Sequence, residues 1–269
     1  MSTSTRRIGA ILWKEWHELR QLKSLLAGAF GMPMLFTAIP LAALYAMRLA
    51  PMDEMSDAKG MLELLSADPT FALLSDVEKM QVAMGGPMSM FIMLLPVMIP
   101  SMVASYSIVG EKTSQTLEPL LATPIRTWEL LLGKMLTAFI PTLALTWIYA
   151  AVFAFGVSFV AASDAVFARL VGGAWLIAVL VLAPALSMLA IAVTVGVSSR
   201  AKDPRTAQEA SALLVVPLVM LIPAQLGGLL LIDTQLVLIA SGVLSVLAAI
   251  AIWVVQRMFD REWILTRWR

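Results

Sequence analysis

Residues 131–161, LLGKMLTAFIPTLALTWIYAAVFAFGVSFVA, contain no charged side chain after Lys134. A helix needs roughly 20 apolar residues to cross the hydrocarbon core of a bilayer, and this stretch exceeds that length. An uncharged run of this length is also too long for a strand or for an ordinary core helix of a soluble domain. The stretch Leu131–Ala161 therefore predicts a membrane-spanning helix.

Five more stretches of the chain have the same character. They are Leu25–Met47, Met88–Val109, Leu170–Ser198, Leu213–Ile232 and Leu236–Gln256. We therefore expect an all-α integral membrane protein with six transmembrane helices. The last two stretches are separated only by residues 233–235, so a re-entrant hairpin over residues 224–235 is an alternative to a tight turn.

Composition supports this class and excludes several others. The apolar set makes up 60% of the 269 residues, charged residues make up 14%, and the mean hydropathy is +0.87. Soluble domains are about half apolar and about a quarter charged. The chain has no cysteine, which excludes disulfides, thiolate metal sites and cysteine nucleophiles. A net charge of +1 gives no general electrostatic case for nucleic-acid binding.

Lysine and arginine predict the orientation, because cytoplasmic loops carry the excess of these residues. One side would hold 15 of the 19 and the other four, Arg48, Lys59, Lys79 and Arg169. We therefore expect both termini on the cytoplasmic side of the cell inner membrane. The expected parts are an interfacial helix over residues 1–24, a transmembrane domain over 25–256 and a cytoplasmic tail over 257–269. The domain would contain an outer loop over 48–87, a coupling loop over 110–129 and a cytoplasmic loop over 199–210.

The predicted spans carry no ionisable side chain in their middle, which argues against a proton- or ion-coupled carrier. Their polar groups are neutral, and the candidates for lining a cargo path are Ser101, Ser105, Tyr106, Thr142, Thr146 and Gln225. The chain also has no catalytic constellation, no predicted metal site and no phosphate-binding loop. Gly133-Lys134 resembles the end of such a loop, but Trp128 and Met135 stand where glycine and serine or threonine are needed. Energy for transport would therefore come from another chain.

Residues 6–23 read as an amphipathic helix lying in the membrane interface. Its apolar stripe is Ile8, Leu12, Trp16 and Leu19. Glu15 falls within this stripe and breaks the pattern. Two interpretations stay open: a carboxylate that reaches solvent or pairs with Arg20 or Lys23, and a polar contact with a partner subunit.

The segment between the second and third spans predicts a short cytoplasmic helix. Thr116 can cap it, Pro119 fits its first turn, and Pro124 ends it after Thr123. Leu117, Leu120 and Leu121 then share one face. That face either rests on lipid or docks into a groove of another protein. A new helix is expected to begin at Thr127, with Glu129 in its first turn.

These segments together resemble the membrane subunits of type-2 ABC transporters, the ABC-2 permease family. The resemblance is carried by Gly110-Glu111-Lys112, by Thr116-Leu117-Glu118-Pro119-Leu120-Leu121-Ala122-Thr123-Pro124 and by Glu129-Leu130-Leu131-Leu132-Gly133-Lys134. Trp13-Lys14-Glu15 and Phe259-Asp260-Arg261-Glu262 add support at the two ends of the chain.

The resemblance implies a transport subunit that is not itself an enzyme and that works as a dimer. Each copy would bind a separate cytoplasmic ATPase, which would hold ATP and Mg²⁺, and no cofactor is expected in this chain. The residues expected to couple the two subunits are Glu15, Glu111, Thr116, Leu117, Glu118, Leu120 and Leu121. The implied function is ATP-driven export by alternating access; the alternative is a non-transporting membrane partner, such as a sensor or assembly factor.

Overall fold

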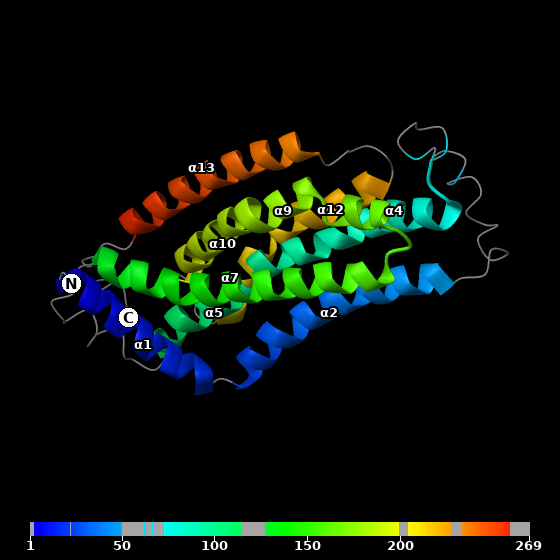
Figure 1. Ribbon diagram of the computed structural model, residues 1–269. Coiled ribbons are helices and arrows are strands. Elements are labelled where there is room, and N and C mark those ends of the chain that lie inside the picture. The colour runs from blue at the N-terminus through cyan, green and yellow to red at the C-terminus, as the bar shows by residue number, and fades with distance from the viewer. Residues whose placement is uncertain are drawn as a thin grey trace.

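The computed structural model describes residues 3–21, 23–49, 62, 66, 71, 73–113, 127–198, 204–226 and 233–258. All of the regular elements among them are helices. The long ones form an elongated bundle (Figure 1). They are α1 (Thr3–Gln21), α2 (Lys23–Leu49), α5 (Leu95–Thr113), α7 (Thr127–Val160), α10 (Ala183–Ser198) and α13 (Thr234–Met258). The shorter ones are α4 (Asp76–Ser89), α8 (Asp164–Leu170), α9 (Gly173–Ile177), α11 (Pro204–Ala212) and α12 (Val215–Leu226).

Five helical stretches among the described residues are long and apolar enough to cross a membrane. They are Leu25–Leu49, Asp76–Tyr106, Trp128–Val160, Asp164–Ser198 and Thr234–Arg257. The chain runs back and forth, so the start of α7 and the end of α13 lie at the same end of the bundle as α1 (Figure 1). We call this the α1 end, and we call the opposite end, where α4 and α13 begin, the α4 end.

The second crossing begins earlier than the sequence predicts. Residues 76–87, expected in the outer loop, form most of α4, which continues through a 3₁₀ segment, Met90–Leu94, into α5. A capping box starts α4, because the Ser75 side chain accepts from the Glu78 backbone and the Glu78 side chain accepts from the Ser75 backbone. This S-x-x-E signal was present in the sequence.

The fifth predicted span, Leu213–Ile232, is described only as far as Leu226. Its described part, α12, has 12 residues and rises about 18 Å, which is shorter than the hydrocarbon. The polar helix α11 precedes it and begins at Pro204. Because α11 packs on α5 and α10 while α12 packs on α4, the two helices together run along the bundle toward the α4 end. Residues 227–232, which form half of the segment 224–235 where a re-entrant hairpin was the alternative to a tight turn, lie outside the described residues.

The fourth crossing changes its winding between α9 and α10. Residues Ala178–Leu182 form a π-helical turn, in which the Ala183 amide donates to the Ala178 carbonyl. The next bond of this pattern would join residue 184 to Val179, but Pro184 has no amide hydrogen. The Trp147 indole of α7 donates to the Val179 carbonyl at 3.1 Å instead. A neighbouring helix thus satisfies the carbonyl that the proline leaves open.

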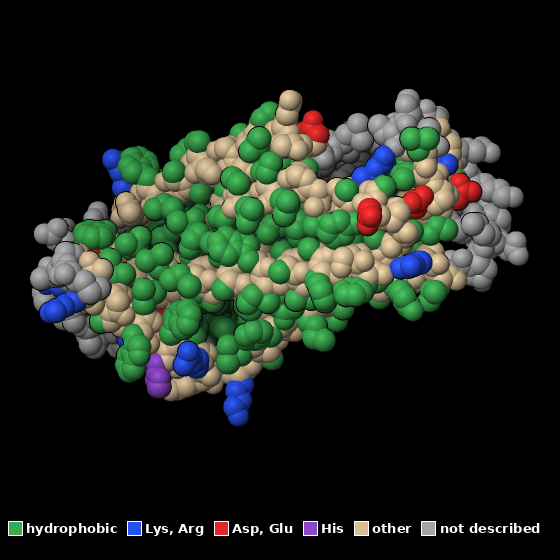
Figure 2. Space-filling view, viewed as in Figure 1, with side chains coloured by type: hydrophobic (Ala, Val, Ile, Leu, Met, Phe, Trp, Pro, Cys, Tyr) green, Lys and Arg blue, Asp and Glu red, His purple; other side chains and the backbone are tan. Residues whose placement is uncertain are grey.

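The dimensions of α7 locate the apolar band of the bundle. From Ile140 to Val160 an α-helix rises about 30 Å, which is the thickness of the hydrocarbon core. Exposed apolar side chains cover this part of α7, among them Ile140, Ile148, Phe155 and Phe159. Hydrophobic side chains also cover the middle of the molecule in Figure 2. Arg48, which donates to the carbonyl of Phe159, marks the edge of the band toward the α4 end.

Candidate functional site: the contact between α1 and α7

A buried ion pair joins α1 to the first turns of α7. The Lys134 ammonium lies 2.7 Å from a Glu15 carboxylate oxygen, and both side chains are only 3% exposed. Glu15 therefore pairs with a residue of α7 and not with Lys23 or Arg20, the partners considered from the sequence. The sequence places Lys134 only near the start of a span and gives no sign of this pairing.

A second carboxylate, Glu129, lies five residues before Lys134 in the first turn of α7. Glu129 is completely buried and accepts a hydrogen bond from the Ser4 hydroxyl. The Arg7 guanidinium lies 3.4 Å from its other oxygen. Arg7 is more than a third exposed, so water screens this second pair more than the first. Two carboxylates and two cations are thus brought together along one side of α1.

Close backbone approach supports both pairs. A Cβ atom built on Gly133 would lie 2.8 Å from the Ile11 side chain, so the glycine leaves room for Ile11. Ile11 is 5% exposed. The face that α1 buries is therefore centred on Ile11 and Glu15, about one residue around the helix from the predicted stripe of Leu12 and Trp16. The two residues that resemble the end of a phosphate loop therefore contact α1: Gly133 packs against Ile11 and Lys134 pairs with Glu15. We call Ser4, Arg7, Ile11 and Glu15 with Glu129, Gly133 and Lys134 the α1–α7 clamp.

The clamp fixes geometry more than it adds stability. Removing two charges from water costs several kcal/mol per ion, and their attraction offsets this only when the geometry is good. The loss of one member is costly, at about 3–5 kcal/mol, because the other charge stays buried without compensation. The clamp thus selects one register of α1 on α7 and penalises others.

The predicted coupling segment lies directly before this clamp in the chain. Residues 114–126, which include Thr116, Leu117, Glu118, Leu120 and Leu121, lie outside the described residues. Glu111 belongs to the last turn of α5. α7 begins at Thr127, with Glu129 in its first turn, as the sequence predicts.

The predicted cargo-path residues occupy different environments. Ser105, Thr142 and Thr146 are completely buried within the subunit, and the first two donate to carbonyls of their own helices. The Thr146 hydroxyl has no hydrogen-bond partner among the described residues. Tyr106 is half-buried beside the core around Leu131 and Ile191. Gln225 lies in the last turn of α12.

Ser101 differs from these residues because it lines an open groove. The groove has a volume of 640 Å³ and lies between α2, α5, α11 and α12. Its lining is mostly apolar and includes four methionines, Met32, Met98, Met102 and Met220, with the polar side chains of Gln208 and Glu209. Glu209 pairs with Arg205 one turn away on α11, at 2.9 Å. Sequence reasoning placed Glu209 outside the spans, so it missed this carboxylate at the groove.

No group of three or more histidine, aspartate or glutamate side chains within the described ranges could hold a metal ion. The polar groups of the α1–α7 clamp pair with one another and hold the two helices together.

Comparison with known proteins identifies the family of this chain. The family model described as "ABC-2 family transporter protein" matches residues 9–239, which cover most of α1 and continue into α13. A search of the curated proteins gives no match. The family is the one that the coupling segment and the start of α7 resemble. The chain belongs to the ABC-2 family of transporter proteins and is a multi-pass membrane subunit of an ABC transporter.

Proposed function

We propose that this chain is the permease of an ATP-driven exporter and moves cargo across the cell inner membrane by alternating access. A separate cytoplasmic ATPase binds ATP and Mg²⁺ and supplies the motion. Membership of the ABC-2 family supports the membrane subunit and the association with an ATP-binding subunit. The mechanism below rests on the arrangement of α1 and α7.

The α1–α7 clamp is the observation that carries this proposal. A force applied to the segment Thr116–Thr123 enters the bundle at the start of α7. There Glu129 and Lys134 are already fastened to α1, so α1 and the first turns of α7 move as one body. Leu117, Leu120 and Leu121 dock on the ATPase in this scheme, with Thr116, Glu118 and Glu111 as polar neighbours. Glu15 contributes by holding α1 in place.

The α1 end faces the cytoplasm in this scheme. Arg6, Arg7, Lys14, Arg20 and Lys134 gather there, in agreement with the charge rule for cytoplasmic segments. The helices α11 and α12 together supply the remaining crossing, which makes six and returns the chain to the cytoplasmic side. Both termini are then cytoplasmic.

Two copies form the transporter in this scheme, and the groove at Ser101 lines its cargo path. Its methionines form an adaptable apolar wall. Glu209 and Gln208 add polarity at one end. Such a lining suits an apolar or amphiphilic cargo better than a hydrophilic one.

A pull-down from detergent-solubilised native membranes tests the coupling. We expect an ATPase to co-purify with the wild type and to be lost from Leu117→Asp/Leu121→Asp at equal expression. A charge buried in a protein groove removes most of the docking energy, so the expected loss is at least about tenfold. Leu73→Asp is the matched control, because Leu73 is 98% exposed at the α4 end.

Two outcomes contradict the proposal. An ATPase that stays bound to the double variant refutes the coupling segment. An ATPase that binds but shows no cargo-dependent stimulation after reconstitution in liposomes refutes transport and favours a non-transporting partner.

A further inference from the structure

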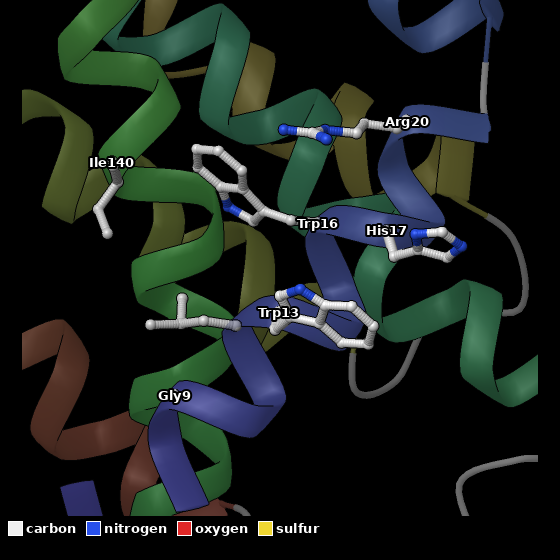
Figure 3. Close-up of a pocket in the computed structure, with 7 residues that line it drawn as sticks. Gly9, Trp13, Trp16, His17, Arg20 and Ile140 are labelled. Carbon is white, nitrogen blue, oxygen red and sulfur yellow. The ribbon is translucent and has the colours of Figure 1, made fainter. Parts of the chain in front are cut away.

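A pocket beside α1 is not used by the clamp. It has a volume of 390 Å³ and lies in front of α1, with Ile140 of α7 at its edge. In Figure 3 the Trp16 ring and the Arg20 side chain both point toward α7, while Trp13 and His17 form the opposite wall. The rings of Trp13 and His17 stack, with their centroids 5.8 Å apart.

A second, apolar crevice continues from this pocket toward the membrane interior. Its volume is 290 Å³, and Trp16 and Arg20 line both spaces. The rest of its lining comes from α1, α2, α5 and α7, and it includes Leu25, Leu26, Phe30, Pro141, Ala144 and Leu145. The pocket, which has polar side chains at its edge, and the apolar crevice thus share Trp16 and Arg20. This arrangement fits an amphiphile with a polar head group and an apolar tail.

The charge at this junction favours an anionic head group. Arg20 is exposed and has no acidic partner among the described residues. The two carboxylates of α1 are engaged elsewhere, since Glu18 pairs with Lys14 and Glu15 with Lys134. No carboxylate lines either space. A guanidinium with free donors is the group best suited to a phosphate.

The junction also lies at the depth of a phospholipid head group. Ile140 is about 30 Å of helix rise from Val160, so it marks the boundary of the hydrocarbon nearest α1. Tryptophan rings favour this boundary, because their bodies are apolar and their indole nitrogens are polar. Trp13 is 75% exposed and Trp16 is 37% exposed here, and α1 has not buried them against protein.

We propose that the junction of α1, α2 and α7 is a binding site for one anionic phospholipid. The phosphate binds Arg20 between Trp16 and the Trp13–His17 stack, and an acyl chain fills the crevice beside Leu26 and Ala144. The bound lipid holds α1 against α7 from the side opposite Glu15. The site is independent of the ATPase and of the cargo.

Native mass spectrometry of the detergent-purified full chain tests this site. The probes are dioleoylphosphatidylglycerol, dioleoylphosphatidylcholine and glycerol 3-phosphate. We expect wild type to bind phosphatidylglycerol in preference to phosphatidylcholine. Arg20→Gln should lower the affinity for phosphatidylglycerol about fivefold, as expected for one basic residue at an anionic surface. Binding of phosphatidylcholine should stay unchanged.

Two further variants distinguish lipid binding at this site from general electrostatic attraction of anionic lipid to α1. Arg6→Gln removes the same charge from α1, but Arg6 lies about 21 Å of helix rise from Arg20 along α1, which is outside the Debye length. It should leave binding unchanged. Ala144→Phe, at an exposed position, fills the crevice and should weaken phosphatidylglycerol binding while Arg20 remains.

The proposal is overturned if Arg20→Gln binds phosphatidylglycerol as wild type does, or if Arg6→Gln weakens binding equally. Binding of glycerol 3-phosphate that Ala144→Phe leaves intact would assign the pocket to a soluble phosphate compound and would also overturn the lipid site.

Discussion

The two ends of the bundle fasten their helices with the same layout but with different chemistry. At the α1 end Glu129 precedes Gly133 by one turn of α7, and the glycine receives Ile11 of α1. At the α4 end Gln81 precedes Gly85 by one turn of α4, and a Cβ on Gly85 would lie 2.8 Å from Leu44. Each end thus pairs a buried polar side chain with a close approach at glycine.

The partners of the two polar groups differ. Gln81 is neutral, and its amide donates to the carbonyls of Leu44 and Val160 and accepts from the Ala162 amide at 2.8 Å. It therefore holds two stretches of backbone against α4, α2 at Leu44 and the end of α7 at residues 160–162. Glu15 and Glu129 instead hold side chains, Lys134 and Arg7. The α4 end is therefore joined through backbone carbonyls and a backbone amide, and the α1 end through ion pairs between side chains.

The most severe test of this difference is Lys134→Met. It leaves the Glu15 carboxylate buried without its cation, and we expect a loss of about 3–5 kcal/mol in unfolding free energy. Thermal unfolding of the purified protein measures it. The double variant Glu15→Leu/Lys134→Met should recover most of the loss, because both charges are then absent. A double variant as unstable as the single one would show that the pair is not the source of the effect.

Gln81→Leu tests the opposite end and should cost less, about 2–3 kcal/mol. It removes no charge, but it leaves the Ala162 amide without its acceptor. The same thermal unfolding assay measures this change, and Gln235→Leu, at an exposed position, is the matched control. If Gln81→Leu left the unfolding free energy unchanged, the hydrogen bonds of the Gln81 side chain would not be what joins α2, α4 and α7.

Gly133→Ala probes the close approach alone. The new methyl group meets Ile11, so we expect a loss of about 1–3 kcal/mol. Gly86→Ala is the matched control, since nothing lies within 4 Å of its built Cβ, and it should be neutral or slightly stabilising. Equal effects of the two substitutions would mean that α1 can move away from α7 at no cost.

The same comparison shows what sequence reasoning could and could not reach. Long apolar runs in the sequence predict the five membrane-spanning helices of the described residues. They do so because a helix must be long and apolar to cross a bilayer, whichever helices pack beside it. The early start of α4 was missed because Lys79 and Gln81 look like loop residues, although both are buried. Their burial depends on Ser66, Leu44 and other groups distant in sequence, which no local pattern reveals.

The site shows the same limit. Glu15 stands out in the sequence as a carboxylate in an apolar stripe, and that signal was sound. Its partner Lys134 lies more than 100 residues away, near the start of a predicted span. The buried face of α1 lies about one residue around the helix from the predicted stripe. This shift follows from the pairing with Lys134 and from the close approach at Gly133, so it could not be derived from the periodicity of α1 alone.

The π turn at Ala178–Leu182 has a consequence for how the fourth crossing moves. A π turn accommodates one residue more than an α turn, so Ala178 and Ala183, five residues apart, both reach the buried face. This surplus residue lies at Pro184, where the amide ladder is already interrupted and a tryptophan of α7 closes the gap. The fourth crossing is therefore two helical segments joined at a π turn, and a bend between α9 and α10 would be located at this turn.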